Sequence, residues 1–200
     1  MDIDALIGRI KATPAKGRRK LIALAGPPAS GKSTLAEALA ARTGGTVVPM
    51  DGFHLDDRIL LARGHRDRKG APHTFDAAGF LNLVSRLAVE AEVIAPVFDR
   101  ARELSIAGAL VVGPGCHTVI VAGNYLLHDV PVWRDLARYW DLSIRLDVAE
   151  ATLRTRLEKR WLSHGFSAER TRAWIEGNDI PNIRETLASS LPSDIVVEVP

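Results

Sequence analysis

Cysteine is nearly absent from this sequence, and neither sign of charge is in excess. Cys116 is the one cysteine in 200 residues, so no internal disulfide can form. This argues against the small disulfide-stapled scaffolds that are typical of secreted proteins. Lysine and arginine total 26 against 24 acidic residues, which gives a formal net charge of +2. So small a balance offers no electrostatic argument for binding nucleic acid or an anionic membrane.

Long hydrophobic runs are missing as well. No apolar stretch approaches the roughly 20 residues of a membrane-spanning helix. The first residues, MDIDALI, carry acids where a secretory signal peptide needs positive charge. Hydrophobic residues nevertheless make up 46% of the chain, enough to bury a core. We therefore expect a cytoplasmic protein without membrane or nucleic-acid partners, folded as a single domain over residues 1–200.

The sequence GPPASGKST at residues 26–34 matches the phosphate-binding pattern G-x-x-x-x-G-K-[ST]. In such a P-loop, backbone N–H groups surround a polyphosphate, and glycines let the backbone approach it closely. Lys32 supplies a mobile positive charge, and the Ser33 hydroxyl is placed to reach a magnesium ion. The alternative is a glycine turn that matches the pattern by chance. The residues expected to contact nucleotide are Gly26, Pro27, Ala29, Ser30, Gly31, Lys32, Ser33 and Thr34.

The surrounding pattern places this loop between a strand and a helix. Residues 21–25 predict a buried strand, and residues 35–41 predict a helix, which is the order that anion binding requires. Residues 93–98 and 109–112 predict strands that pair at a sheet edge. Alternating strands and helices imply an α/β fold, with a mainly parallel central sheet and helices on both faces. The remaining strands are predicted at residues 46–50, 118–122, 142–146 and 195–199.

Chemistry is expected where the carboxyl ends of the strands face the P-loop. Asp51 follows the second predicted strand, and a carboxylate there can accept a proton from a hydroxyl or hold a metal ion through water. The alternative is a turn aspartate, because Asp51-Gly52 is a common turn dipeptide. The P-loop favours the catalytic interpretation. Cys and His show no metal-ligand spacing, so a metal would arrive with the nucleotide, and Ser33 and Asp51 are its candidate ligands.

The segment RGHRDRKG at residues 63–70 is strongly basic. A charge run of this kind is usually a solvated surface loop. Its place in a long connection after Asp51 also suits binding of an acceptor. His54 has the same two interpretations, as a ligand contact or as an ordinary loop histidine.

The words DGF at residues 51–53, RKGAP at 68–72 and TFD at 74–76 occur in this order along the chain. Together they resemble the bacterial pantothenate kinase and uridine kinase group, which includes phosphoribulokinase. The resemblance implies a three-layer P-loop NTPase fold. It also implies transfer of the γ-phosphate of ATP, bound with Mg²⁺, to a hydroxyl of a small metabolite such as a sugar, a nucleoside or a pantothenate-like compound.

Four further words are MDGFHLD at residues 50–56, PVFDR at 96–100, GNYLL at 123–127 and ND at 178–179. They resemble, more narrowly, bacterial proteins labelled fructose transport system kinases. The resemblance runs from the P-loop to about residue 182, nearly the whole chain. It matches Asp51 to the catalytic base. The candidate acceptor-side residues are His54, Arg68, Lys69, Asp99, Arg100, Asn124 and Tyr125.

One position departs from the pattern of this group. The strand before Gly123 commonly ends in glutamate there, whereas this chain has Ala122. That glutamate would help to position magnesium or substrate, so its absence weakens the expectation of catalysis more than that of ATP binding. An ATP-binding regulatory module with weak or lost turnover therefore remains as an alternative.

Residues 150–164 predict an arginine-rich helix, within a possible helical lid at about residues 150–182. Arg156 and Arg160 share one face and are placed to reach the phosphates on closure. The alternative is a solvated face paired with nearby glutamates. Arg160 is the preferred lid residue, because similar kinases place a basic residue in this region.

The sequence therefore predicts a phosphotransferase with an alcohol group as acceptor, in which Asp51, Lys32 and Arg160 are catalytic. Its partners are ATP and a small hydroxyl-bearing metabolite, whose identity does not follow from these residues. A nucleic-acid-dependent ATPase is disfavoured by the small net charge. The sequence leaves the oligomeric state open, and a homodimer is compatible with it.

Overall fold

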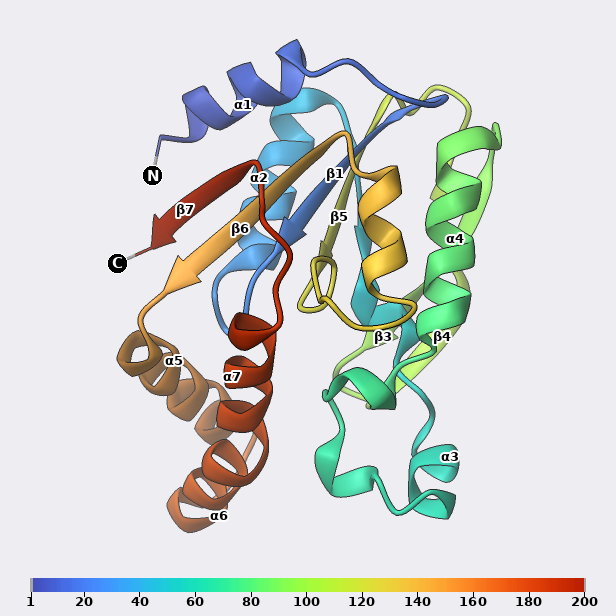
Figure 1. The fold of residues 1–200 in the computed structure, drawn as a ribbon. Coiled ribbons are helices and arrows are strands. Elements are labelled where there is room, and N and C mark those ends of the chain that lie inside the picture. The colour runs from blue at the N-terminus through green and yellow to red at the C-terminus, as the bar shows by residue number, and fades with distance from the viewer. Residues whose placement is uncertain (1, 200) are drawn as a thin grey trace.

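A computed structural model describes residues 2–199, and a parallel sheet forms its centre (Figure 1). Within these residues, five strands pair in the order β2-β5-β1-β6-β7, all of them parallel. This confirms the α/β class and the mainly parallel sheet predicted from the sequence. The strand bounds are Lys20–Ala25 (β1), Thr46–Pro49 (β2), Thr118–Gly123 (β5), Leu142–Val148 (β6) and Ile195–Val199 (β7).

The central position of β1 follows from its apolar sequence. Its last five residues are buried, as is every residue of its neighbour β5. A parallel strand that is covered on both faces requires such a continuous apolar run. The register aligns Leu24 of β1 with Ala122 of β5 and with Ile144 of β6. The carboxyl ends of these strands therefore finish at one edge of the sheet.

Helices cover both faces of this sheet (Figure 1). Helices α1 and α2 pack on one face, and α4 packs on the other. Both faces are thus covered, as predicted. The helix bounds are Ile3–Ala12 (α1), Lys32–Thr43 (α2), Asp57–Ala62 (α3), Ala77–Val89 (α4), Glu150–Ser163 (α5), Ala168–Trp174 (α6) and Ile180–Ala188 (α7).

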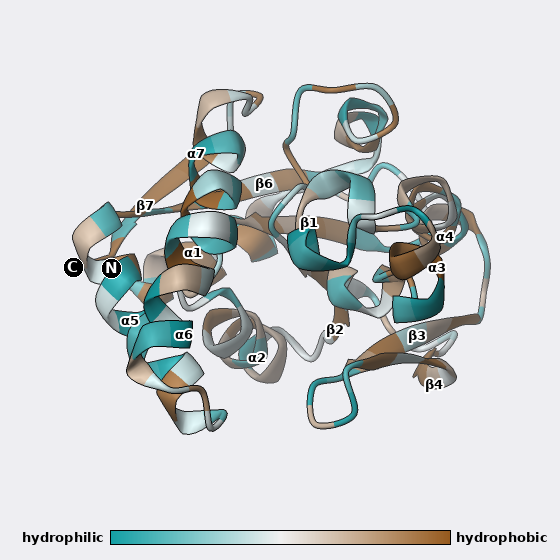
Figure 2. Cartoon of the chain, turned by 90° about the horizontal axis from the view of Figure 1, so that it is seen from below, coloured by the Kyte–Doolittle hydropathy of each residue, from teal (hydrophilic) through white to brown (hydrophobic). Residues whose placement is uncertain are grey.

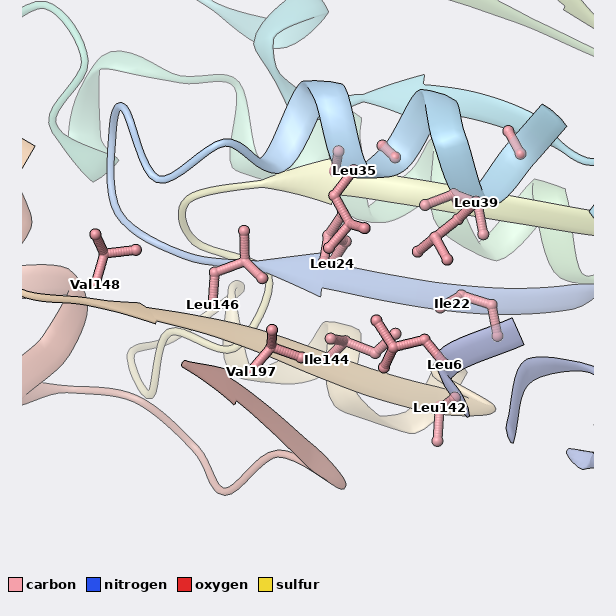
Figure 3. Packing of buried hydrophobic residues seen from close by; sticks show 14 of the residues in the cluster. Leu6, Ile22, Leu24, Leu35, Leu39, Leu142, Ile144, Leu146, Val148 and Val197 are labelled. Carbon is pink, nitrogen blue, oxygen red and sulfur yellow. The ribbon is translucent and has the colours of Figure 1, made fainter. Parts of the chain in front are cut away.

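The core beneath α2 shows why the first helical face is stable. Leu35 and Leu39 of α2 lie over Leu24 of β1 (Figure 3). Each leucine that is fully buried in this way stabilises the fold by ~1.5–3 kcal/mol. The packing fixes α2, and with it the P-loop that leads into the helix.

Hydropathy follows the same layers. The strands are mostly brown, and the outer helices α5 and α6 carry much of the teal (Figure 2). In residues 2–199, no helix is both long enough and apolar enough to cross a membrane.

The strands predicted at residues 93–98 and 109–112 form, but they do not lie at an edge of the parallel sheet. They are β3, Val93–Asp99, and β4, Leu104–Val112, which pair antiparallel with one another apart from that sheet. Val93, Ala95 and Val112 are buried in the core that α4 covers. Because this core holds the hairpin, β3 and β4 pack across the fold instead of extending the sheet.

A buried arginine ties the start of β1 to the end of α4. The Arg19 side chain is 1% exposed, and its guanidinium donates to the carbonyl oxygens of Leu87, Glu90, Ala91 and Cys116 at 2.8–3.3 Å. Carbonyls at a helix C-terminus have no partners within the helix and carry partial negative charge. Arg19 therefore closes the end of α4.

We expect Arg19→Gln to lower the free energy of unfolding by about 3 kcal/mol, because buried carbonyls lose a charged donor. The neighbouring Arg18 is exposed, so Arg18→Gln is the matched control and should change little. Urea denaturation of both variants checks this. Equal midpoints for the two variants would contradict the assignment.

Candidate active site

The loops that follow the strands lie at the carboxyl edge of the sheet (Figure 1). The P-loop leaves β1 and enters α2, Asp51 follows β2, Asn124 follows β5, and α5 follows β6. Segments far apart in the sequence therefore meet at the edge where parallel sheets bind their ligands.

The backbone of the P-loop is shaped to bind an anion. Gly31 has a φ of +94° and begins α2 without a side-chain cap, so side chains leave the first N–H groups of the helix free. A Cβ on Gly26 would lie 3.1 Å from the Cβ of Leu146, closer than ordinary contact, so glycine lets the loop pack against β6. Ser33 and Thr34 are exposed in the first turn of α2.

The Lys32 side chain folds back onto the P-loop. Its Nζ donates to the carbonyl oxygen of Pro27 at 2.8 Å and lies 3.4 Å from Ser30 Oγ. Desolvation lowers the pKa of Lys32 to about 7; the charge of Asp51 opposes this shift, and those of Arg100 and Arg160 add to it. The site thus has an excess of positive charge that an anion would relieve.

Asp51 lies beyond β2 in the helical turn Met50–Phe53. Its Oδ2 accepts a hydrogen bond from Arg100 Nη2, and the two side chains are 26% and 47% exposed. The structure therefore brings Asp51 and Arg100 together. The charge of Asp51 also acts on Lys32.

Ala122 stands beside this group at the end of β5. It aligns with Pro49 of β2, two residues before Asp51, and is almost fully buried. Its methyl group contributes no ligand to the edge, so oxygen donors there come from other positions.

Two of the predicted acceptor residues make contacts within the protein. Lys69 Nζ donates to Asp57 Oδ1 at 2.7 Å and to the Glu103 carbonyl at 3.0 Å, and the side chain is 5% exposed. Tyr125 is fully buried, and its hydroxyl donates to the Gly70 carbonyl at 2.6 Å. Both side chains hold the loop of residues 63–70 in place, so neither is open to an acceptor.

Arg68 and Asp99 are also held by the protein itself. Arg68 donates to the Gly177 carbonyl at 2.6 Å and to Asn182 Oδ1 at 3.0 Å. Asp99 Oδ2 accepts from Arg102 Nε at 2.8 Å, and that pairing lowers the pKa of Asp99. The loop at residues 63–70 is therefore held by hydrogen bonds to the rest of the protein, and the charged groups of Arg68 and Lys69 take part in them.

His54 packs between aromatic rings. Its ring stacks on Phe75 at 4.0 Å and lies 4.7 Å from the Phe98 ring. Burial lowers the pKa of His54 to about 4, so the ring is neutral at pH 7. Its Nδ1 is buried and has no hydrogen-bond partner within residues 2–199.

Helix α5 carries its two candidate arginines to different places. Arg156 Nη1 lies 3.4 Å from the carbonyl oxygens of both Ala29 and Ser30, directly on the P-loop. Arg160 lies one turn further on, over the Trp161 ring. Burial lowers the pKa of Arg160, and the positive charge of Arg100 lowers it further. The sequence prediction preferred Arg160, whereas Arg156 is the arginine in contact with the P-loop.

A π-helical segment, Ile175–Asp179, makes hydrogen bonds both to α5 and to the basic loop at residues 63–70. Asn178 Nδ2 donates to the Lys69 carbonyl at 3.0 Å, and Asp179 Oδ2 accepts from Trp161 Nε1 at 2.7 Å. The sequence analysis assigned no role to these residues, although the ND word at 178–179 marked the position. π-Helical turns are frequent at functional sites.

A small hollow lies beside the start of the P-loop, where Gly26 and Pro27 line it. Asn124 lines it, so the hollow is continuous with the end of β5. Arg145 Nε is buried there without a hydrogen-bond partner in the described part of the chain. Its polar and glycine lining comes from Gly26, Asn124, His128, Arg145, Thr186 and Ser190.

Comparison with known proteins identifies the family. A family model described as an AAA domain matches residues 22–172, about three quarters of the chain. The chain belongs to this P-loop family. Its match to the P-loop and the sheet agrees with the geometry described above.

Three similar proteins match nearly all of the chain, and two of them carry kinase names. YggC of Escherichia coli K12 is 36% identical over 91% of this chain and 78% of its own length. A protein of Schizosaccharomyces pombe, named as a candidate uridine kinase, is 34% identical over 98% and 89%. A crystal structure from Silicibacter sp. TM1040, titled as a candidate fructose transport system kinase, is 49% identical, with a TM-score of 0.94 over 98% and 99%. The predicted resemblance to the uridine and pantothenate kinase group is thus confirmed.

Burial gives Asp179 a measurable pH dependence. Desolvation raises the pKa of Asp179 from an ordinary 3.8 to about 6, against the opposing effects of the Trp161 hydrogen bond and the Arg160 charge. Between these values the folded state binds more protons than the unfolded state, so the contribution of Asp179 to stability falls as pH rises. The loss amounts to about 2–3 kcal/mol at neutral pH.

We therefore expect Asp179→Asn, which keeps an oxygen for Trp161, to be more stable than the wild type at neutral pH. The two proteins should be nearly equal at about pH 3, below the window in which the group titrates. Urea denaturation at both pH values measures the difference, with the exposed Asp67→Asn as control. A difference that does not change with pH would contradict the assignment.

Proposed function

We propose that the chain is an ATP-dependent kinase that transfers the γ-phosphate of ATP to a hydroxyl group of a small metabolite. One observation carries this proposal: the Asp51 carboxylate stands just beyond β2, where its charge acts on the P-loop Lys32. Phosphoryl transfer to a hydroxyl needs a phosphate-binding cation and a base for the hydroxyl proton. The kinase names of the relatives support the same class of reaction.

In this proposal the triphosphate binds along the P-loop. Lys32 leaves the Pro27 carbonyl for the β- and γ-phosphates, and Arg156 supplies charge from α5. Asp51 takes the acceptor proton as the hydroxyl oxygen bonds to the γ-phosphorus. The bond from phosphorus to the bridging oxygen breaks, and ADP departs with the electron pair.

Mg²⁺ fits the donors available. The Ser33 hydroxyl and the Asp51 carboxylate are hard oxygen ligands, and Mg²⁺ is usually held by one or two carboxylates together with substrate phosphates. The bound ion would neutralise charge on the transferred phosphoryl group. With Ala122 at the end of β5, the protein offers one carboxylate fewer than related kinases.

Residues 150–182 form a lid over the phosphates and keep out water, a competing acceptor. Residues 1–200 act together as one domain in this scheme.

We expect Asp51→Asn to lower kcat by about 10²- to 10⁴-fold, because the base is lost. Binding of ADP should change little, since the P-loop is intact. Release of ADP with a panel of sugars, nucleosides and pantothenate measures turnover, and calorimetry measures nucleotide binding. Asp67→Asn, an exposed carboxylate, is the control. Unchanged turnover in Asp51→Asn would reject Asp51 as the base.

Ala122 supports a second candidate, an ATP-binding regulatory module with weak turnover. We expect the wild type to turn over with an acceptor, and Ala122→Glu to raise kcat about tenfold by improving metal positioning. Ala122→Gln, similar in shape but uncharged, is the control. Tight ATP binding by the wild type without stimulation by any acceptor, and turnover only in Ala122→Glu, would favour the regulatory module.

A further inference from the structure

The acceptor side of the site is short of free carboxylates. Asp57 accepts from Lys69 at 2.7 Å and from Arg66 at 2.6 Å, and Asp99 is held by Arg102. Glu103 Oε2 lies 3.5 Å from Lys69 Nζ, and Asp51, the proposed base, is paired with Arg100. A neutral sugar or nucleoside presents many hydroxyl donors, which need carboxylate or amide oxygens as partners. The side chains here are poorly suited to that task.

Guanidinium groups, in contrast, are available. Arg100 is about half exposed, and Asp51 is its partner. Arg160 is half-buried and makes no ion pair with an acidic side chain of residues 2–199. With Arg156 assigned to the P-loop by its contacts, Arg100 and Arg160 are the cations left to face an acceptor. Each lowers the pKa of Lys32, which places both near the reacting end of the site.

The pairing of Arg100 with Asp51 is also easy to exchange. A partly exposed ion pair contributes little to stability, so a carboxylate or phosphate of a ligand can replace Asp51 as a partner of the guanidinium. The planar fork of arginine binds such groups through two parallel hydrogen bonds. This exchange would free Asp51 Oδ2 to take the hydroxyl proton.

We propose that the acceptor carries an anionic group, a carboxylate or a phosphate, in addition to its reacting hydroxyl, and that Arg100 binds this group. The proposal rests on the proposed kinase function and names the substrate class of the same site. Arg100 determines specificity: it selects the anionic acceptor, and its departure from Asp51 coincides with acceptor binding. Arg160 adds positive charge to the same region.

The test uses pairs of acceptors that differ in the anionic group. Glycerate with glycerol and pantothenate with pantothenol test carboxylates, and ribose 5-phosphate with ribose tests phosphates. We expect the wild type to favour the anionic member of at least one pair by tenfold or more in kcat/KM. Arg100→Gln should raise KM for that member at least tenfold and leave KM for ATP unchanged. Arg102→Gln, a nearby exposed arginine, should behave as the wild type.

Equal use of the neutral members, or an effect of Arg100→Gln on KM for ATP alone, would overturn the proposal while leaving the kinase function intact. Thermal shifts of the ADP-bound protein provide a readout that needs no turnover. Saturable stabilisation by an anionic probe, lost in Arg100→Gln, supports the anion site even if no phosphate is transferred, and in that case the kinase function is what fails. No stabilisation by any anionic probe, with ADP bound and no turnover, overturns the anion site.

Discussion

Burial of both faces of the parallel sheet is the constraint on which the rest of this structure depends. Polar side chains cannot remain along β1 or β5, whose residues are almost all buried, so they are confined to the strand ends. The parallel register brings those ends to one edge, where Leu24 and Ala122 lie side by side. The P-loop, Asp51 and α5 are neighbours for this reason, although α5 begins 99 residues after Asp51 and more than 100 residues after the P-loop.

Positive charge is concentrated at this edge of the sheet. The charges of Arg100 and Arg160 both act on Lys32, Asp51 opposes them there, and Asp179 acts on Arg160 more strongly than Asp51 does. Burial lowers the pKa of Lys32 to about 7, and the charges of the two arginines add to that shift. Two features of this edge therefore favour an anion: the free N–H groups at the start of α2, and basic side chains that are partly shielded from water.

The sequence predicted those features that depend on residues close together in the chain. The P-loop and the strand before it follow from a short motif and an apolar run, and both are found where they were expected. The fate of Tyr125 was beyond such reasoning, because its hydroxyl bonds to Gly70, 55 residues away. The predicted position of β3 and β4 was wrong for the same reason. Their sequence predicts strands, but the place of these strands in the fold depends on packing against the core under α4.

The two arginines of α5 show how the site can separate its two substrates. A helix presents Arg156 and Arg160 on one face about one turn apart, so a helix anchored at the P-loop by the first must hold the second further out. Asp179 and Trp161 fix that second position, and Asn178 ties it to the basic loop. The spacing between the P-loop and Arg160 is therefore fixed by α5 and by these contacts, and none of them involves Ala122.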